Sequence, residues 1–133
     1  MKKLAARFSL LAILPAVALG GIGAAASAAD QTYALTRKIK VGGDGGWDYV
    51  TLDAAGKLLY VTRTTHTMVI DAASGQTIHD IPGTARAHGV VLMPDLGRGF
   101  ISDGKDARVL VFDLNSGATL GKVPAAEDAD SII

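Results

Sequence analysis

The sequence predicts an all-β protein of the β-propeller class, built from four-stranded blades. Three observations lead to this prediction: a repeat of about 40 residues, turn motifs that recur at the same place in each repeat, and short runs of β-branched and aromatic residues between the turns. A repeat of about 40 residues is the length of one four-stranded propeller blade. The chain holds about two such repeats and the start of a third, so we expect a fragment of a closed ring of seven blades.

The first element, residues 1–28, is expected to be a secretory signal peptide. Lys2, Lys3 and Arg7 make a short basic start, an uncharged apolar run extends from Phe8 to Gly23, and Ala26-Ser27-Ala28 offers the small residues of a cleavage site. An uncleaved membrane anchor is the alternative, because the segment from Phe8 to Ala29 is about as long as the roughly 20 residues that span a bilayer. We therefore expect a periplasmic or secreted bacterial protein that meets a membrane only through an uncleaved signal segment.

The remaining residues, 29–133, have the composition of one small acidic domain. Loss of the three basic signal residues leaves 10 Lys and Arg against 13 Asp and Glu. A nucleic-acid partner is unexpected, since proteins that bind nucleic acids usually carry a basic surface. The sequence has no cysteine, which excludes disulfides, thiol chemistry and thiolate metal sites.

Residues 29–46 are expected to contain an N-terminal strand and a glycine-rich loop. Tyr33–Val41 has a strand-like pattern and lies about 40 residues before the fourth strand of the first repeat. This spacing predicts the outer strand of a blade that closes the ring, with a plain N-terminal extension as the alternative. Gly42–Gly46 predicts a flexible loop between blades, since it lacks the Lys-Ser/Thr pair and helix of a phosphate-binding loop.

The first repeat, residues 47–86, is predicted to form four strands. They are expected at Tyr49–Asp53, Leu58–Thr62, Met68–Asp71 and Gln76–Ile81. In the turn Asp71–Gly75, the aspartate can accept backbone N–H groups and the glycine can adopt the left-handed conformation without a steric penalty. The sequence therefore predicts antiparallel hairpins throughout the repeat.

The second repeat, residues 87–127, follows at an offset of 40 to 42 residues. Asp113–Gly117 repeats the turn of Asp71–Gly75, and the two-residue difference in offset lies at Thr64–Thr67, which is expected to be a loop. Residues 128–133 align with the start of both repeats and are expected to begin a third repeat that is cut short.

Several of these segments resemble the YVTN family of β-propeller repeats and its YncE-like exported members. The resemblance rests on Leu59-Tyr60-Val61-Thr62, on the two V-[IF]-D-x-x-S-G turns and on the repeat length, and it covers most of the chain after the signal. The sequence departs from the family motif at Arg63, where asparagine is usual, and at Phe100-Ile101-Ser102-Asp103. The resemblance implies a propeller of WD40-like blade size, and it allows single-stranded DNA binding by stacking on Trp47 or Tyr49.

Equivalent positions of the repeats provide the candidate site. The first strand of each blade runs along the central channel of a propeller, so residues that precede these strands converge at one mouth. The candidate ligand-binding residues are Trp47, Asp48, His66, His88 and Asp130, of which Asp48, His88 and Asp130 share one repeat position. The alternative is that they only cap or hydrogen-bond neighbouring turns. His66 is expected in a polar loop, and His79 is expected at the surface of an edge strand.

The function predicted from these observations is an exported binding module for a small molecule or a protein at the propeller mouth. No motif with diagnostic catalytic spacing is present, so no catalytic residue, cofactor or metal is assigned. His66, His88, Asp48 and Asp130 are the only set that the fold can bring together around a metal. A lactonase-like or quinoprotein-like enzyme with a metal or cofactor remains one alternative, and single-stranded DNA binding remains another.

Overall fold

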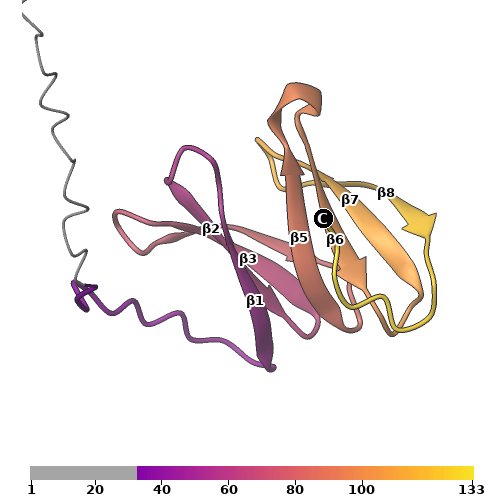
Figure 1. Cartoon of the computed structure of the whole chain (residues 1–133), viewed down its shortest axis with the longest axis horizontal. Coiled ribbons are helices and arrows are strands. Elements are labelled where there is room, and N and C mark those ends of the chain that lie inside the picture. The colour runs from indigo at the N-terminus through magenta and orange to yellow at the C-terminus, as the bar shows by residue number, and fades with distance from the viewer. Residues whose placement is uncertain (1–32) are drawn as a thin grey trace, which may run out of the picture. The chain divides into compact units, whose positions relative to one another are not determined.

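The computed structural model of the protein describes residues 33–133, so the predicted signal peptide lies outside the described residues. Residues Thr36–Ile133 form one compact unit. Its elements are β1 (Trp47–Leu52), β2 (Leu58–Arg63), β3 (His66–Asp71), β4 (Thr77–Pro82), β5 (Ala87–Met93), the short 3₁₀ helix η1 (Pro94–Leu96), β6 (Arg98–Asp103), β7 (Arg108–Asp113) and β8 (Thr119–Pro124) (Figure 1). Within residues 33–133, no helix has the length and apolar character needed to cross a membrane.

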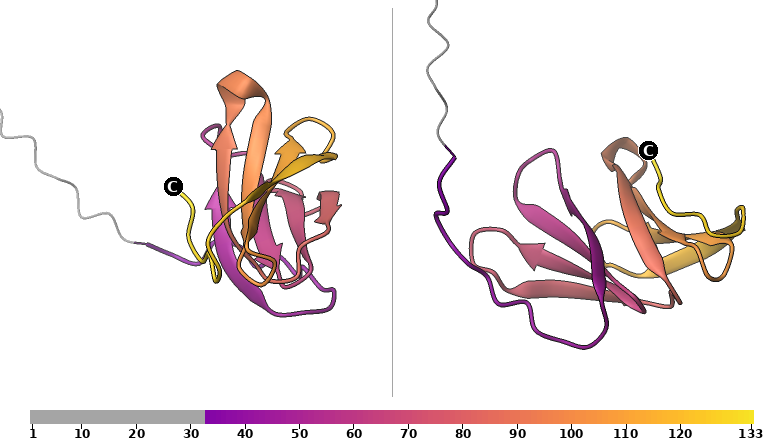
Figure 2. Two further views of the ribbon diagram at one scale, coloured as in Figure 1. Left: turned by 90° about the vertical axis from the view of Figure 1, so that its right-hand side faces the viewer. Right: turned by 60° about the horizontal axis from the view of Figure 1, so that its bottom comes forward.

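The strands form two four-stranded antiparallel sheets, one from each predicted repeat. Their orders are β1-β2-β3-β4 and β5-β6-β7-β8, so every strand pairs with its neighbour in the sequence (Figures 1 and 2). This arrangement confirms the predicted four-stranded units. The β2–β3 loop is shorter than expected, because His66 and Thr67 belong to β3, where they pair with Pro82 and Ile81 of β4. The equivalent loop of the second sheet is residues 104–107, which accounts for the difference in repeat offset.

The outer turns have the predicted chemistry. The Asp71 carboxylate accepts hydrogen bonds from the backbone N–H of Ser74 at 2.6 Å and from its hydroxyl at 2.8 Å. Asp113 makes the same two bonds with Ser116, both at 2.8 Å. In each turn the backbone N–H of Ser, followed by its hydroxyl, lowers the pKa of the aspartate.

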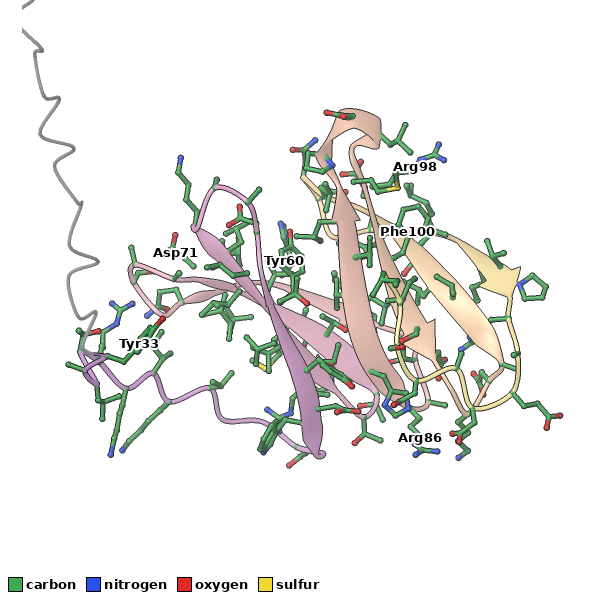
Figure 3. The ribbon with its side chains drawn as sticks, in the orientation of Figure 1. Tyr33, Tyr60, Asp71, Arg86, Arg98 and Phe100 are labelled. Atoms are coloured by element: carbon green, nitrogen blue, oxygen red, sulfur yellow. The ribbon has the colours of Figure 1, made fainter. Side chains whose placement is uncertain are left out.

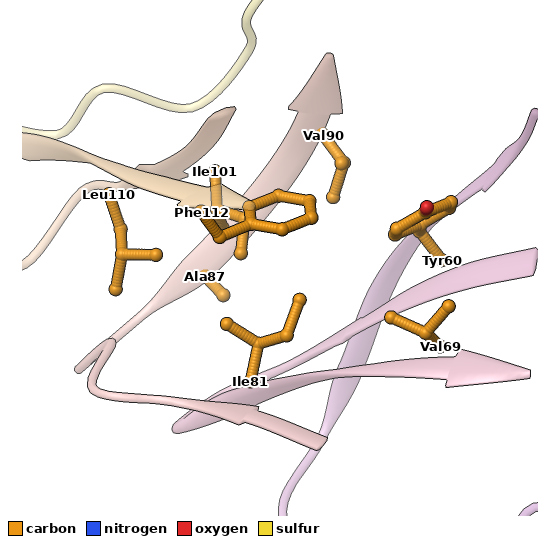
Figure 4. Packing of buried hydrophobic residues seen from close by; sticks show 8 residues of the cluster. All are labelled: Tyr60, Val69, Ile81, Ala87, Val90, Ile101, Leu110 and Phe112. Atoms are coloured by element: carbon orange, nitrogen blue, oxygen red, sulfur yellow. The ribbon is translucent and has the colours of Figure 1, made fainter. Parts of the chain in front are cut away.

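The hydrophobic core lies between the two sheets (Figure 4). It contains Tyr60, Val69 and Ile81 from the first sheet and Ala87, Val90, Ile101, Leu110 and Phe112 from the second. The rings of Tyr60 and Phe112 meet across this layer with their centroids 6.0 Å apart, and burial raises the pKa of the Tyr60 hydroxyl. Phe112 also lies over Gly99 of the neighbouring strand, where a Cβ atom would overlap its ring. The equivalent cross-strand pair of the first sheet is Leu59 with Ile70.

Two charged side chains at the same repeat position fasten the segments that lead into the sheets. Arg63, only 8 % exposed, donates hydrogen bonds to the backbone carbonyls of all five residues of Gly42–Gly46, at 2.8–3.2 Å. Asp103, which is fully buried, accepts hydrogen bonds from the backbone N–H groups of Ala85 and Arg86 at 2.9–3.1 Å and from the Arg108 Nε at 3.1 Å. The loop predicted to be flexible is therefore tied to the sheet by one guanidinium group.

The segment before β1 differs from the prediction, because residues 33–46 contain no strand. A strand requires a hydrogen-bonded neighbour, and no described strand pairs with this segment. It nevertheless packs like an outer strand. Ile39 lies against Gly75, with its Cγ2 3.0 Å from the position of a Cβ, just as His79 lies 2.9 Å from the equivalent position at Gly117. Its place as part of a closing blade stays a prediction.

His79 is a correction to the sequence-based expectation of a surface residue. Its Nε2 lies 3.0 Å from the carbonyl oxygen of Asn115 in the β7–β8 turn. His79 is half-buried because the β7–β8 turn, at Asn115 and Gly117, packs against its ring. Alternation along β4 could not reveal this contact, since the turn that makes it lies 36 residues away.

Candidate functional site

A β-bulge at the start of each first strand aims the candidate side chains. The register shifts between Trp47 and Val50 in β1, and between Ala87 and Val90 in β5. A bulge bends the strand and redirects the side chains of the extra residue. Asp48 and His88 lie within these two bulges, so the same backbone irregularity presents both.

A hydroxyl group from the neighbouring strand stabilises each bulge. The Thr62 hydroxyl accepts a hydrogen bond from the backbone N–H of Tyr49 at 2.9 Å, and the Ser102 hydroxyl accepts one from Gly89, also at 2.9 Å. These hydroxyls satisfy backbone amides that the irregular pairing would otherwise leave without an acceptor. Thr62 and Ser102 occupy equivalent positions of the two repeats, but the sequence pattern did not indicate that both would bind the bulged backbone.

The segment after β8 brings the third side chain to the same place. The Ser102 hydroxyl donates a hydrogen bond to the carbonyl oxygen of Asp130 at 3.0 Å, and Ile132 packs on Gly89, with its Cγ2 3.0 Å from the position of a Cβ there. After the end of β8, the chain therefore passes back to β5, the first strand of the same sheet (Figures 1 and 2). Residues 128–133 form no strand.

The three side chains from equivalent repeat positions converge on one point. His88 Nδ1 contacts a carboxylate oxygen of Asp48 and lies 3.0 Å from a carboxylate oxygen of Asp130. One ligand atom from each residue lies within 4.8 Å of the others. The His88 side chain is 6 % exposed, while those of Asp48 and Asp130 are 40 % and 63 % exposed. The cluster thus has a buried imidazole base and two carboxylates that face solvent.

The Nδ1 atom of His88 faces two carboxylate acceptors, whereas its Nε2 atom has no hydrogen-bond partner among the described residues. Nδ1 carries at most one proton, so it cannot donate a full hydrogen bond to both carboxylates. Nε2 is buried and has no hydrogen-bond partner within residues 33–133. It lies against Gly104, where a Cβ would be 3.1 Å from Nε2, so a glycine leaves room for the ring.

A cleft of about 200 Å³ adjoins the cluster. Its walls are formed by Gly46, Trp47, Asp48, Thr64, Arg86, Ala87 and His88. The guanidinium of Arg86 pairs with Asp128 at 2.7 Å rather than with the cluster carboxylates. Figure 3 shows Arg86, which lines the cleft, at the opposite end of the second sheet from Arg98.

The two other candidate residues have different positions. The Trp47 side chain lines the cleft and is 77 % exposed. His66 is outside the cluster: its Nδ1 lies 3.1 Å from the Thr65 hydroxyl, and its Nε2 lies 3.9 Å from Asp80. His66 lies at the start of β3, rather than in a loop, which explains why it contacts β4 and not the cluster residues of β1 and β5.

Comparison with known proteins bears on the fold. No family model matches the sequence, and no match is found among curated proteins. Hydrazine synthase from Kuenenia stuttgartiensis superposes with a TM-score of 0.60 at 13 % identity, over 72 % of this chain and 28 % of that one. The chain has the β-propeller fold.

A second solved structure is a periplasmic gluconolactonase, PpgL, from Pseudomonas aeruginosa. It matches at 19 % identity with a TM-score of 0.49, over 70 % of this chain and 30 % of that one. The chain therefore spans less than a third of the length of either structure. In the β-propeller fold the first strand of each blade is the innermost, so the cluster lies at one end of the inner strands β1 and β5, which contact one another.

Proposed function

We propose that this chain is part of an exported β-propeller of the YVTN-like kind whose function is to bind a ligand at the end of its inner strands. The observation that supports this function is the convergence of Asp48, His88 and Asp130 from equivalent repeat positions onto one point. Hydrogen bonds between neighbouring turns alone would not require two carboxylates that are 40 % and 63 % exposed to solvent. The exported location rests on the sequence of residues 1–28 alone.

The charge of the cluster favours a cationic ligand or a ligand that offers hydrogen-bond donors. Two carboxylates face the solvent, and the nearby Arg86 is already paired with Asp128. Carboxylates accept strong hydrogen bonds from charged donors. The cleft beside Trp47 provides an aromatic face for the rest of the ligand, and such faces attract cations.

Thermal shift measurements test the proposed function. The protein is screened against a panel of ammonium, guanidinium and amino-acid compounds, sugars and divalent metal ions, together with the variants Asp48→Asn and Asp130→Asn. We expect at least one compound to raise the melting temperature of the wild type and not of the variants, because a ligand bound only by the native state stabilises it. Equal shifts in the wild type and both variants would place the binding elsewhere and refute the proposal.

Export is tested separately with a reporter. Residues 1–28 are fused to an enzyme that needs disulfides and therefore becomes active only outside the reducing cytoplasm. We expect activity with the native segment, and no activity when Leu10, Leu11 and Leu14 are replaced by lysine, since the apolar run would be interrupted.

A metal- or cofactor-dependent enzyme is the second candidate, because a buried imidazole beside two solvent-facing carboxylates also suits acid–base chemistry. Turnover of lactone or ester substrates that is lost in Asp48→Asn would favour it. Single-stranded DNA binding is the weaker alternative. Trp47 is exposed for stacking, but the carboxylate of Asp48 beside it repels phosphate groups.

A further inference from the structure

The donor atoms of the cluster have the chemistry of a metal site. One imidazole nitrogen and two carboxylate oxygens come from β1, from β5 and from the segment after β8, and they lie within 4.8 Å of one another. Mixed nitrogen and oxygen ligands suit Zn²⁺ and neighbouring divalent transition metals, whereas Mg²⁺ and Ca²⁺ prefer oxygen alone. The donor atoms therefore favour divalent transition metals over Mg²⁺ and Ca²⁺, a distinction that the negative charge of the carboxylates alone would not make.

A second observation makes this more than a cluster of acidic groups. The His88 side chain is 6 % exposed, and its Nδ1 points at both carboxylates. Since one N–H group cannot satisfy both, the two acidic groups compete for one proton on this nitrogen. A cation among the three atoms would instead accept a lone pair from Nδ1 and from each carboxylate.

Within residues 33–133, no Lys or Arg side chain forms an ion pair with Asp48 or Asp130. Arg86, which lines the same cleft, bonds to Asp128 instead. Like charges held close together cost free energy unless a cation lies between them. We propose that Asp48, His88 and Asp130 bind one divalent transition-metal ion, with Zn²⁺ as the best match. This inference rests on the proposed function, because it names the ligand class of the same site.

Three protein ligands leave part of the coordination sphere open. Asp48 and His88 line the cleft of about 200 Å³, and the side chains of Asp48 and Asp130 are 40 % and 63 % exposed. Zinc sites that act on small molecules have three protein ligands and one open position, whereas purely structural sites are closed by four. The site is therefore built to present the metal to a second ligand, such as a carboxylate or carbonyl oxygen, beside Trp47.

Metal binding is measured on the intact protein by native mass spectrometry and by titration calorimetry with Zn²⁺, with Mg²⁺ for comparison. Co²⁺ serves as a spectroscopic probe, since its visible absorption reports the coordination directly. The test variants are Asp48→Asn and Asp130→Asn. The matched control is Asp95→Asn, an exposed aspartate in η1 that lies outside the cluster and the cleft.

We expect one Zn²⁺ per chain, no comparable affinity for Mg²⁺, and a loss of at least about tenfold in Zn²⁺ affinity in each test variant but not in Asp95→Asn, because the removed oxygen is a direct ligand. His88→Ala risks misfolding, since its ring is buried, so the exposed Asp130 decides the question. Sub-stoichiometric Zn²⁺ binding, or equal affinity in the wild type and Asp130→Asn, would overturn the metal inference.

The same variants separate failure of this inference from failure of the proposed function. If no metal binds but an organic compound stabilises the wild type and not Asp48→Asn, the metal inference is wrong and the ligand-binding function stands. If neither a metal nor any compound distinguishes the wild type from the variants, both are wrong. Gly104→Ala should also weaken the Co²⁺ spectrum, because the added Cβ would lie 3.1 Å from His88 Nε2 and 3.2 Å from the carbonyl oxygen of Ala129, the residue before Asp130; an unchanged spectrum would count against the metal inference.

Discussion

Replacing Gly99 by alanine tests whether this glycine is present to admit the ring of Phe112. The two residues are cross-strand partners in β6 and β7, and the ring is 1 % exposed. A Cβ at Gly99 would overlap the ring, whose nearest atom is Cζ, so the ring must move out of its place in the core. The strain therefore falls on the residue that meets Tyr60 of the other sheet.

The expected magnitude follows from the cost of overfilling the core, an upper limit on that cost, and one opposing gain from the alanine. Overfilling a packed core costs about 1–3 kcal/mol, and complete loss of a buried phenylalanine, which costs about 3–5 kcal/mol, sets the upper limit. In the opposite direction, alanine is more favourable than glycine inside a strand by about 0.5–1 kcal/mol. We expect Gly99→Ala to lower the free energy of unfolding by about 2 kcal/mol.

Urea denaturation followed by circular dichroism measures this change, with Phe112→Ala and the double variant completing a mutant cycle. Once the ring is absent, the alanine at position 99 should stabilise the strand by about 0.5–1 kcal/mol, which gives a coupling energy of about 3 kcal/mol. Gly121→Ala in β8 is the matched control, because a Cβ there would have no neighbour within 4 Å. If Gly99→Ala destabilises the protein equally with and without the Phe112 ring, the reasoning is refuted.

Other predictions concern the charged side chains. Arg63→Ala should lower the free energy of unfolding by about 1.5–3 kcal/mol, the range for hydrogen bonds to a charged group, and an unchanged urea midpoint would mean that the loop is held otherwise. Asp103→Asn should lower the free energy of unfolding by about 3 kcal/mol, the low end for breaking a buried ion pair, because the Arg108 side chain is 22 % exposed; an unchanged urea midpoint would contradict this. Folding lowers the pKa of Asp71 and Asp113 below their ordinary value of 3.8, so their stabilisation is complete above that pH and is lost as the pH falls through the lowered pKa. Asp113→Asn should therefore flatten the loss of stability between about pH 5 and pH 2, measured by urea titration, and an unaltered pH dependence would argue against it.

Much of the fold could be predicted from the sequence because the repeat encodes local geometry. Asp71–Gly75 and Asp113–Gly117 contain both the hydrogen-bond acceptor and the glycine that their turns use. The convergence of Asp48, His88 and Asp130 could also be anticipated, since equivalent residues of stacked repeats approach one axis.

Contacts between positions that are not equivalent in the repeats could not be predicted. The contact of His79 with Asn115, and the hold of Arg63 on Gly42–Gly46, join residues that no short pattern relates. The sequence predicts a loop around His66 because Thr64–Thr67 is uniformly polar. In the structure, however, Thr67 is fully buried in β3. Polarity predicted exposure there, but backbone pairing with β4 decided the outcome.

The opposite charges at the equivalent positions 63 and 103 have a consequence for how such a protein can change over evolution. Arg63 faces a linker that presents carbonyl oxygens, whereas Asp103 faces one that presents N–H groups. If the two repeats exchanged places without their linkers, a carboxylate would face oxygens and a guanidinium would face N–H groups. The repeats share one architecture, but each is matched to the segment that precedes it, so duplication or permutation of a blade succeeds only when the blade and its linker move together.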